Sequence, residues 1–279
     1  MPLRTASALG RKATLRTRLR DAIYSRYAKR LSGQLAGRPR PRHIGFVVDG
    51  NRRWAKSVGL STVDGHRAGA EKIKTLLRWC DEQGIRHVTL YLLSTENLNR
   101  GPEELKPLME IIEGVVNDLA ADGNPWPVEI IGTLDMLPGD MARNLKTAAA
   151  RTQGRRSGAQ VNAAIGYGGR QEIVDAVRSL MLEHAATGRG MRELAEEVNP
   201  ALISEHLYTQ AQPDPEIIIR TSGEQRISGF LLWQSAEADL HFADCYWPAL
   251  RYVDFLRALR SFADRRQVAG RFPSLGSIH

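Results

Sequence analysis

The stretch HIGFVVDGNRRWA, residues 43–55, decides the fold. It starts with an apolar run at 44–48, which stops at Asp49, Gly50 and Asn51. A short apolar run bounded by turn residues is typical of a buried β-strand. The polar turn that follows leads towards a helix and offers backbone N–H groups, which bind phosphate well. The same residues also suit an ordinary turn with Asp49 as a helix cap, so this stretch alone leaves both interpretations open.

This alternation of strand and helix patterns repeats along the chain. Strand-like runs occur at 44–48, 88–93, 128–131, 161–165, 217–219 and 240–242. Helical spacing occurs at 68–80, 102–119, 140–153, 171–183, 191–199 and 253–265. The pattern predicts an α/β fold, a single-domain, central, mostly parallel six-stranded sheet surrounded by helices. Ligands bind at the carboxyl ends of such strands, where polar clusters stand at 49–53, 94–97, 166–170 and 220–228.

The charge of the chain is concentrated at its N-terminus. The 279 residues are 42% apolar and 25% charged, which is typical of globular proteins, and the net charge is +8. Residues 1–42 contain twelve Lys or Arg and one acidic residue, whereas the remainder has 27 basic and 30 acidic residues. We therefore expect a basic N-terminal arm at 1–42, separate from a mildly acidic body at 43–279. Leu15, Leu19, Ile23 and Tyr27 recur every four residues, so the arm suits either a solvated helix or a helix on an anionic membrane.

The residue types of the first and last clusters suit phosphate chemistry. Asp49 would repel a bare phosphate, so it is better explained as a ligand of a metal that the phosphate also binds. Arg53 could clamp a phosphate, and Arg220 and Arg226 with neighbouring hydroxyls suit a second one. The alternative is that Glu224 pairs internally with an arginine. The sequence lacks a P-loop, a dinucleotide-binding glycine motif and zinc-ligand spacing, and its two cysteines cannot form a disulfide framework.

Five ordered motifs together resemble the cis-prenyltransferase, or undecaprenyl diphosphate synthase, family. They are HIGFVVDGNRRWA (43–55), GHRAGAEKI (65–73), STEN (94–97), GYGGRQEI (166–173) and RTSGEQRISGFLLWQSAEAD (220–239). The similarity extends from about residue 43 to about 260, and it implies that the body at 43–279 is the catalytic domain. The strings DGNRRWA and YLLSTEN resemble most closely the actinobacterial short-chain branch of the family, which makes (2Z,6E)-farnesyl diphosphate.

The resemblance implies a Mg²⁺-dependent enzyme that condenses isopentenyl diphosphate with an allylic diphosphate, expected to be geranyl diphosphate, in Z configuration. It also implies a homodimer, and a hydrophobic product tunnel walled by helices at 68–80 and 103–119. We expect a cytoplasmic protein, with the basic arm as a possible peripheral contact to the inner face of the cell membrane, and no nucleic-acid partner.

The resemblance assigns roles to sixteen residues. The implied catalytic residues are Asp49, Asn51 and His66, and the implied metal ligands are Asp49 and Asp239. Leu92 stands where long-chain enzymes often have a small residue, so its branched side chain predicts a fifteen-carbon product. The implied substrate-binding residues are Gly50, Arg52, Arg53, Trp54, Ser94, Glu96, Asn97, Arg100, Arg220, Arg226 and Ser228.

Some positions depart from the family pattern and keep alternatives open. Thr62 stands where many members have an arginine, Arg52 replaces a frequent glycine, and Asp239 replaces the usual glutamate. An irregular condensation that branches or cyclises, or a longer-chain product, are the alternatives within the family. A catalytically silent partner subunit and a nucleic-acid binder are alternatives of other classes, which the retained site residues and the acidic body disfavour.

Overall fold

The computed structural model describes residues 22–271 of the chain, and the side chains of 22–268. The described residues divide into two compact units. The larger unit is Pro41–Ala249, and the smaller one consists of residues 22–40 together with those from Leu250 onward.

The centre of the larger unit is a six-stranded sheet. Its strands are β1 (His43–Val47), β2 (His87–Ser94), β3 (Val128–Ile131), β4 (Gln160–Tyr167), β5 (Ile217–Arg220) and β6 (Asp239–Phe242). The strand order is β3-β4-β2-β1-β5-β6, and each neighbouring pair is parallel. Each strand lies where the sequence predicts one, and the α/β prediction is confirmed.

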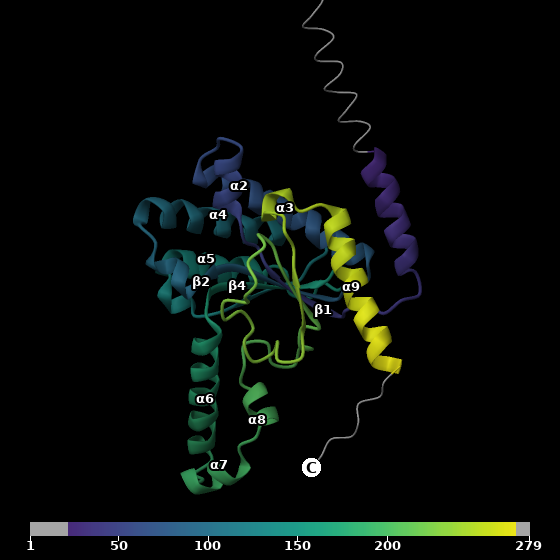
Figure 1. Cartoon of the computed structure of the whole chain (residues 1–279). Helices are drawn as coiled ribbons and strands as arrows, with labels where there is room; N and C mark the ends of the chain where they lie inside the picture. Colours follow the sequence, from purple (N-terminus) through teal and green to yellow (C-terminus); the bar gives the residue numbers. More distant parts are fainter. Residues whose placement is uncertain (1–21, 272–279) are drawn as a thin grey trace, which may run out of the picture. The chain divides into compact units, whose positions relative to one another are not determined.

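The helices of the larger unit follow the predicted alternation. They are α2 (Asn51–Ser57), α3 (Thr62–Glu82), α4 (Pro102–Ala120), α5 (Gly139–Ala150), α6 (Gly169–Ala186), α7 (Met191–Glu197) and α8 (Pro200–Ser204), with short 3-10 helices η1 (Thr95–Asn99), η2 (Leu134–Met136) and η3 (Trp247–Ala249). Helix α3 packs on α4, and α4 packs on α5, so the three form one layer beside the sheet (Figure 1). Helix α6 extends away from the sheet, with α7 near its far end (Figure 1).

Local sequence signals explain where the helices around the first motif begin. Gly50 precedes α2 with a φ of +104°, which L side chains rarely adopt, so the sharp turn between β1 and α2 requires glycine. Ser61 caps α3 by accepting a hydrogen bond from the Asp64 backbone, while the Asp64 carboxylate accepts one from Ser61. Pro102 occupies the first turn of α4, where its missing N–H costs nothing.

A loop between β5 and β6 forms part of the core of this unit. Phe230 and Leu231 are fully buried with Val47, Tyr91 and Tyr167, and the rings of Phe230 and Tyr91 stack at 4.7 Å. The loop also touches the start of α6, where a Cβ on Gly169 would lie 2.3 Å from the Gly229 carbonyl. These contacts fix the loop that carries the second arginine cluster.

The smaller unit is a helix pair. Residues 22–35 are helical and lie beside α9 (Tyr252–Arg271). The Arg251 guanidinium lies 4.3 Å from the centre of the Tyr24 ring, and Arg38 forms a 2.6 Å ion pair with Asp264. Of the predicted apolar face of the arm, Leu15 and Leu19 lie outside the described residues, whereas Ile23 is exposed. No helix within residues 22–271 has the length and apolar character needed to cross a membrane.

Candidate active site

A cavity of about 1080 Å³ opens at the carboxyl ends of β1, β2 and β5. Residues of α2, α3 and α4 complete its wall. Fourteen of the sixteen residues singled out in the sequence line it: Asp49, Gly50, Asn51, Arg52, Arg53, His66, Leu92, Ser94, Glu96, Asn97, Arg100, Arg220, Arg226 and Ser228. The tertiary fold therefore brings four separate motifs to one place.

Asp49 is the centre of the charged end of the cavity. Its Oδ2 accepts hydrogen bonds from Arg220 Nη2 at 2.7 Å, Ser222 Oγ at 3.0 Å and Arg53 Nη2 at 3.3 Å. Burial opposes ionisation of this carboxyl, but the hydrogen bonds from Arg220 and Ser222 and the nearby arginine charges outweigh burial. The pKa of Asp49 is consequently below its usual value, and the side chain is a carboxylate at neutral pH.

The arginines of the last cluster differ in how they are held. The Arg220 side chain is only 6% exposed, and its Nη1 donates to Ser228 Oγ at 2.7 Å and to the Arg226 carbonyl at 2.6 Å. Arg226 is exposed and pairs with Glu224 at 2.8 Å, and Glu224 also pairs with Arg53 at 3.2 Å. The internal ion pair of Glu224 that the sequence left open therefore forms.

Glu104 is a site residue that the sequence reasoning missed. It lies in the first turn of α4, and its Oε1 accepts a hydrogen bond from Arg100 Nη1 at 2.8 Å. Its carboxylate also lies 3.5 Å from Arg52 Nη1 and 3.8 Å from His66 Nε2. Glu104 thus connects three groups that line the cavity. The spacing of four residues from Arg100 was the signal that could have revealed this ion pair.

His66 is a nearly buried group in the same wall. Its side chain is 10% exposed. Burial lowers the pKa of His66, and the charge of Arg100 lowers it further, whereas Glu104 acts in the opposite direction. The net shift is downward, so the imidazole is neutral at neutral pH and can act as a hydrogen-bond donor or acceptor.

Asn51 presents an unused acceptor at the start of α2. Its Nδ2 donates to the Val48 carbonyl at 3.3 Å, while its buried Oδ1 has no hydrogen-bond partner among the described residues. Buried acceptors in proteins are nearly always hydrogen-bonded, and a bound ligand could donate the missing hydrogen bond to this oxygen. The space beside it depends on Gly69, because a Cβ there would lie 2.2 Å from Asn51 Oδ1.

The STEN motif has a structural role in addition to its place in the cavity wall. Ser94 Oγ accepts from the Asn97 backbone at 3.1 Å, and Asn97 Oδ1 accepts from the Ser94 backbone at 3.3 Å. This reciprocal cap stabilises the short helix η1 directly after β2. The cap fixes the loop that leads to Arg100.

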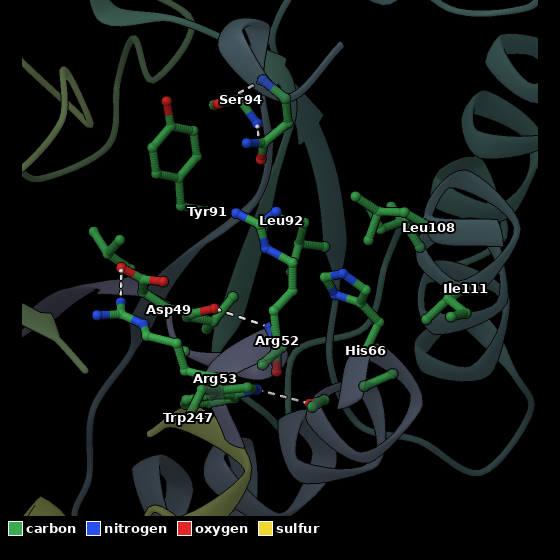
Figure 2. Close-up of a pocket in the computed structure, with 18 of the residues that line it drawn as sticks. Asp49, Arg52, Arg53, His66, Tyr91, Leu92, Ser94, Leu108, Ile111 and Trp247 are labelled. Atoms are coloured by element: carbon green, nitrogen blue, oxygen red, sulfur yellow. Dashed lines mark hydrogen bonds and ion pairs between the residues drawn. The ribbon is translucent and has the colours of Figure 1, made fainter. Parts of the chain in front are cut away.

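The other half of the cavity is apolar. Its lining comes from β2, α3 and α4: Ala70, Ile73, Leu92, Leu108, Ile111, Ile112 and Val115. In the view of Figure 2, Asp49 and Arg53 lie on one side, Leu108 and Ile111 on the other, and Leu92 and His66 between them. A site with cations and a carboxylate at one end and a hydrocarbon wall at the other fits an amphiphilic anion.

The donor set fits Mg²⁺ that is shared with a phosphate. Among residues 22–268, no three His, Cys, Asp or Glu side chains gather into a ready-made metal site. Asp49, however, is an ionised oxygen ligand beside arginines, and Mg²⁺ is commonly held by one or two carboxylates plus substrate phosphates.

Two predicted site residues lie elsewhere. Trp54, on α2, is not among the residues of the cavity wall. Asp239 is the first residue of β6, in register with Ile217, whereas Asp49 follows the end of β1 near Arg220. At about 3.3 Å per residue, the level of Asp239 is roughly 10 Å from that of Arg220 along the strands. Within one chain, the two predicted metal ligands are therefore not brought together, and the role of Asp239 stays a prediction.

Comparison with known proteins places this cavity in a recognised context. A family model described as "Putative undecaprenyl diphosphate synthase" matches residues 47–270. The chain is 55% identical to the (2Z,6E)-farnesyl diphosphate synthase of Thermobifida fusca, over 90% of this chain and 98% of that protein. It is 51% identical to the enzyme of the same name from Mycobacterium tuberculosis, over 91% and 98%.

A solved structure shows the same architecture. Lavandulyl diphosphate synthase from Lavandula x intermedia, in complex with dimethylallyl diphosphate, is 30% identical to this chain, with a TM-score of 0.73. The match covers 80% of this chain and 95% of that one.

Proposed function

The chain belongs to the undecaprenyl diphosphate synthase family of prenyltransferases, and from this premise we propose that it makes (2Z,6E)-farnesyl diphosphate. In the proposed reaction, the C–O bond of geranyl diphosphate breaks and the diphosphate leaves with the bonding electrons. The terminal alkene of isopentenyl diphosphate supplies the pair for the new C–C bond, and loss of a proton forms a Z double bond.

This proposal rests on one observation, that the cavity has a charged end and an apolar end. Asp49, Arg53 and Arg220 supply the charged end, where diphosphates would bind. Leu92 and the apolar face of α4 supply the other end, which suits a short hydrocarbon. Relatives at 50–55% identity that are named (2Z,6E)-farnesyl diphosphate synthases support the short product.

The proposed roles follow from the contacts of each side chain. The α2 backbone from Gly50 onward, with Arg52 and Arg53, would bind the leaving diphosphate at the positive end of the helix. Arg220, Arg226 and Ser228 would bind isopentenyl diphosphate. Neutral His66 would donate a hydrogen bond near the leaving group, and the free Asn51 Oδ1 would assist removal of the proton. Ser94, Glu96, Asn97 and Arg100 would shape the reaction centre, with Trp54 as a supporting residue.

We propose Mg²⁺ as the cofactor. Asp49 would hold it, and the ion would supply positive charge to the departing diphosphate. The carboxylate is kept ionised by Arg220 and Ser222, which is the form that a hard cation requires.

We also propose a cytoplasmic homodimer, with a basic arm at 1–42 and a catalytic domain at 43–279. One face of α6 supports self-association, because Val174, Val177 and Met181 are exposed at helical spacing. Size-exclusion chromatography with light scattering should give the mass of a dimer. A monomer at micromolar concentration would contradict this part of the proposal.

The test of the proposed reaction uses the purified full chain. It is incubated with Mg²⁺, labelled isopentenyl diphosphate and either dimethylallyl, geranyl or (E,E)-farnesyl diphosphate. We expect incorporation with geranyl diphosphate, and a fifteen-carbon product whose new double bond is Z by NMR. Chains of thirty carbons or more would instead support a longer-chain synthase, and no turnover by the single chain would support a silent subunit.

An irregular condensation is a second candidate, because the solved relative at 30% identity is a lavandulyl diphosphate synthase. The presence of Thr62 where many members have an arginine also favours it, since the cavity wall then has one cation fewer. NMR of the product distinguishes the two reactions, because a branched or cyclised skeleton has different connectivity from a linear one.

A further inference from the structure

The helix pair of the smaller unit is strongly basic. Residues 22–40 and 250–268 contain two acidic side chains, Asp254 and Asp264, whereas residues 41–249 have 22 basic and 28 acidic ones. The ten basic side chains of the pair are Arg26, Lys29, Arg30, Arg38, Arg40, Arg251, Arg257, Arg260, Arg265 and Arg266. The net charge of the pair is therefore +8, and that of residues 41–249 is −6. Residues 250–268 contribute five of the ten basic side chains, and residues 22–40 contribute the other five.

Contacts within the pair hold the two helices side by side. Arg251 lies over the Tyr24 ring at 4.3 Å, and Arg257 lies over the Tyr27 ring at 5.3 Å. Both helices are visible in Figure 1, with residues 22–35 in purple and α9 in yellow. Such contacts attract the guanidinium cations to the faces of the aromatic rings. The cations of α9 and those of the arm therefore belong to one folded surface.

The acidic side chains of the pair do not cancel its charge. Asp254 is shared by Arg251 at 3.1 Å and Arg257 at 3.2 Å, and Asp264 pairs with Arg38. Two carboxylates thus face three guanidinium groups. The pair consequently keeps a large excess of positive charge.

Exposed residues on both helices form the outer face of this surface. Arg26, Lys29 and Arg30 are exposed at positions i, i+3 and i+4 of the helix formed by residues 22–35, and therefore lie on one face. Arg265 and Arg266 are exposed near the end of α9. Large apolar side chains are exposed on the same two helices, with Ile23 at 60% and Val268 at 57%. The order of the contacts Tyr24–Arg251, Tyr27–Arg257 and Arg38–Asp264 makes the helices parallel, so Ile23 and Val268 lie at opposite ends of the pair. Clustered cations with an exposed aliphatic side chain at each end suit the boundary between lipid headgroups and acyl chains.

We propose that α9 and the helix of residues 22–35 together form a binding surface for an anionic lipid bilayer. Cations provide long-range attraction to acidic headgroups, and Ile23 and Val268 can enter the acyl boundary. The choice of a bilayer over a nucleic acid rests on the proposed function, because a farnesyl chain partitions into lipid. The surface differs from a simple basic tail because half of it comes from the far end of the sequence.

The experiment measures binding of the full chain to vesicles. Vesicles of phosphatidylcholine with about 30% phosphatidylglycerol, whose anionic headgroups attract basic residues, are compared with pure phosphatidylcholine by flotation. Three triple variants each remove three positive charges. One changes Arg26, Lys29 and Arg30 to Gln, the second changes Arg260, Arg265 and Arg266 to Gln, and the matched control changes Arg143, Lys146 and Arg156, exposed residues of the larger unit, to Gln.

We expect both helix-pair variants to lose affinity for anionic vesicles, and the control to bind like the wild type. About 1 kcal/mol per basic residue near the surface is about fivefold in affinity, so three residues correspond to roughly 100-fold. If the α9 variant bound anionic vesicles like the wild type, the proposal that α9 is part of the surface would be wrong. If the control variant lost as much affinity as the helix-pair variants, the net charge of the protein would explain the binding, and the proposed surface would be wrong. Equal binding of the wild type to pure phosphatidylcholine would overturn the electrostatic mechanism.

Two further measurements test the folding of the variants and the choice of partner. Circular dichroism melting of each variant shows whether the helix pair still folds, and a variant that melts early is replaced by its three single substitutions. Tighter binding to a 30-base-pair DNA than to anionic vesicles at 150 mM salt (roughly physiological strength) would overturn the choice of partner. Turnover with water-soluble substrates, measured without vesicles, tests the proposed function separately. A wild-type protein that binds vesicles but does not turn over would contradict the proposed function and still support the lipid-binding surface.

Discussion

Replacing Asp49 with Asn is expected to destabilise the fold as well as abolish turnover. If Asp49 had only the metal and leaving-group role that the family resemblance implies, removing its carboxylate would leave the fold intact. In the structure, however, the Asp49 carboxylate accepts a 2.7 Å ion-paired hydrogen bond from Arg220, whose side chain is 6% exposed. Without the charge on Asp49, the guanidinium stays buried and loses its carboxylate partner.

The magnitude follows from the burial of the two partners. Removing one member of a fully buried ion pair costs about 3–5 kcal/mol. Asp49 is about a third exposed, so solvent screening reduces the effect, and we expect about 2 kcal/mol. Arg220 retains Ser228 and the Arg226 carbonyl as acceptors, which limits the loss further.

The pH dependence has a defined sign. Because the folded pKa of Asp49 is depressed, the stability that it contributes is present above the unfolded pKa, near 3.8, and is lost as pH falls through the folded pKa. The difference in stability between wild type and Asp49→Asn should therefore be full at pH 7 and shrink in strong acid.

Urea unfolding at pH 7 and at lower pH measures this difference. Asp140→Asn is the control, since Asp140 is exposed on α5, and its stability should stay within about 0.5 kcal/mol of the wild type. Adding Arg220→Met to Asp49→Asn should cost less than the sum of the single changes. Additive losses, or an Asp49→Asn variant as stable as the wild type, would refute the argument from the buried pair.

Three more predictions concern the cavity, the core and the metal. Leu92→Ala should lengthen the product, because it removes a branched side chain from the cavity wall, and radio-chromatography showing unchanged length would place the limit elsewhere. Burial lowers the pKa of His43 to about 4, so its contribution to stability is full above pH 6.5 and falls by about 3 kcal/mol between 6.5 and 4. In a plot of the free energy of unfolding against pH, measured with urea, His43→Gln should flatten the slope between about pH 4 and 6.5. An unchanged slope would mean that other groups cause the pH dependence. Chelation by EDTA should abolish turnover and added Mg²⁺ should restore it, whereas turnover that persists in EDTA would contradict a Mg²⁺-dependent reaction.

The elements of the fold could be predicted from the sequence because its periodicities are local. The run 128–131 coincides with β3, and the helical spacing at 102–119 nearly coincides with α4. The helix α2 was expected only as the element after a polar turn. It has seven residues, which is too short for the apolar repeat by which a helix is recognised.

Part of the candidate site could be predicted in the same way, since motifs at strand ends converge in any parallel sheet. Asp49 and Arg220 meet because β1 and β5 are neighbours in register. Glu104 was missed because its partners Arg52 and His66 come from two other helices. Asp239 is close to Arg220 in sequence order, yet the register of β6 on β5 sets it at the other end of the strand.

The sequence by itself determined the order of strands and helices, the residue types at each strand end and the location of positive charge near the N-terminus. These are properties of neighbouring residues, because backbone preference and apolar spacing act over a few positions. Only the tertiary structure decided which charges pair, which side chains are buried, and that α9 joins the arm in one basic surface. Those outcomes depend on distances between residues as far apart as Arg38 and Asp264, which no local pattern encodes.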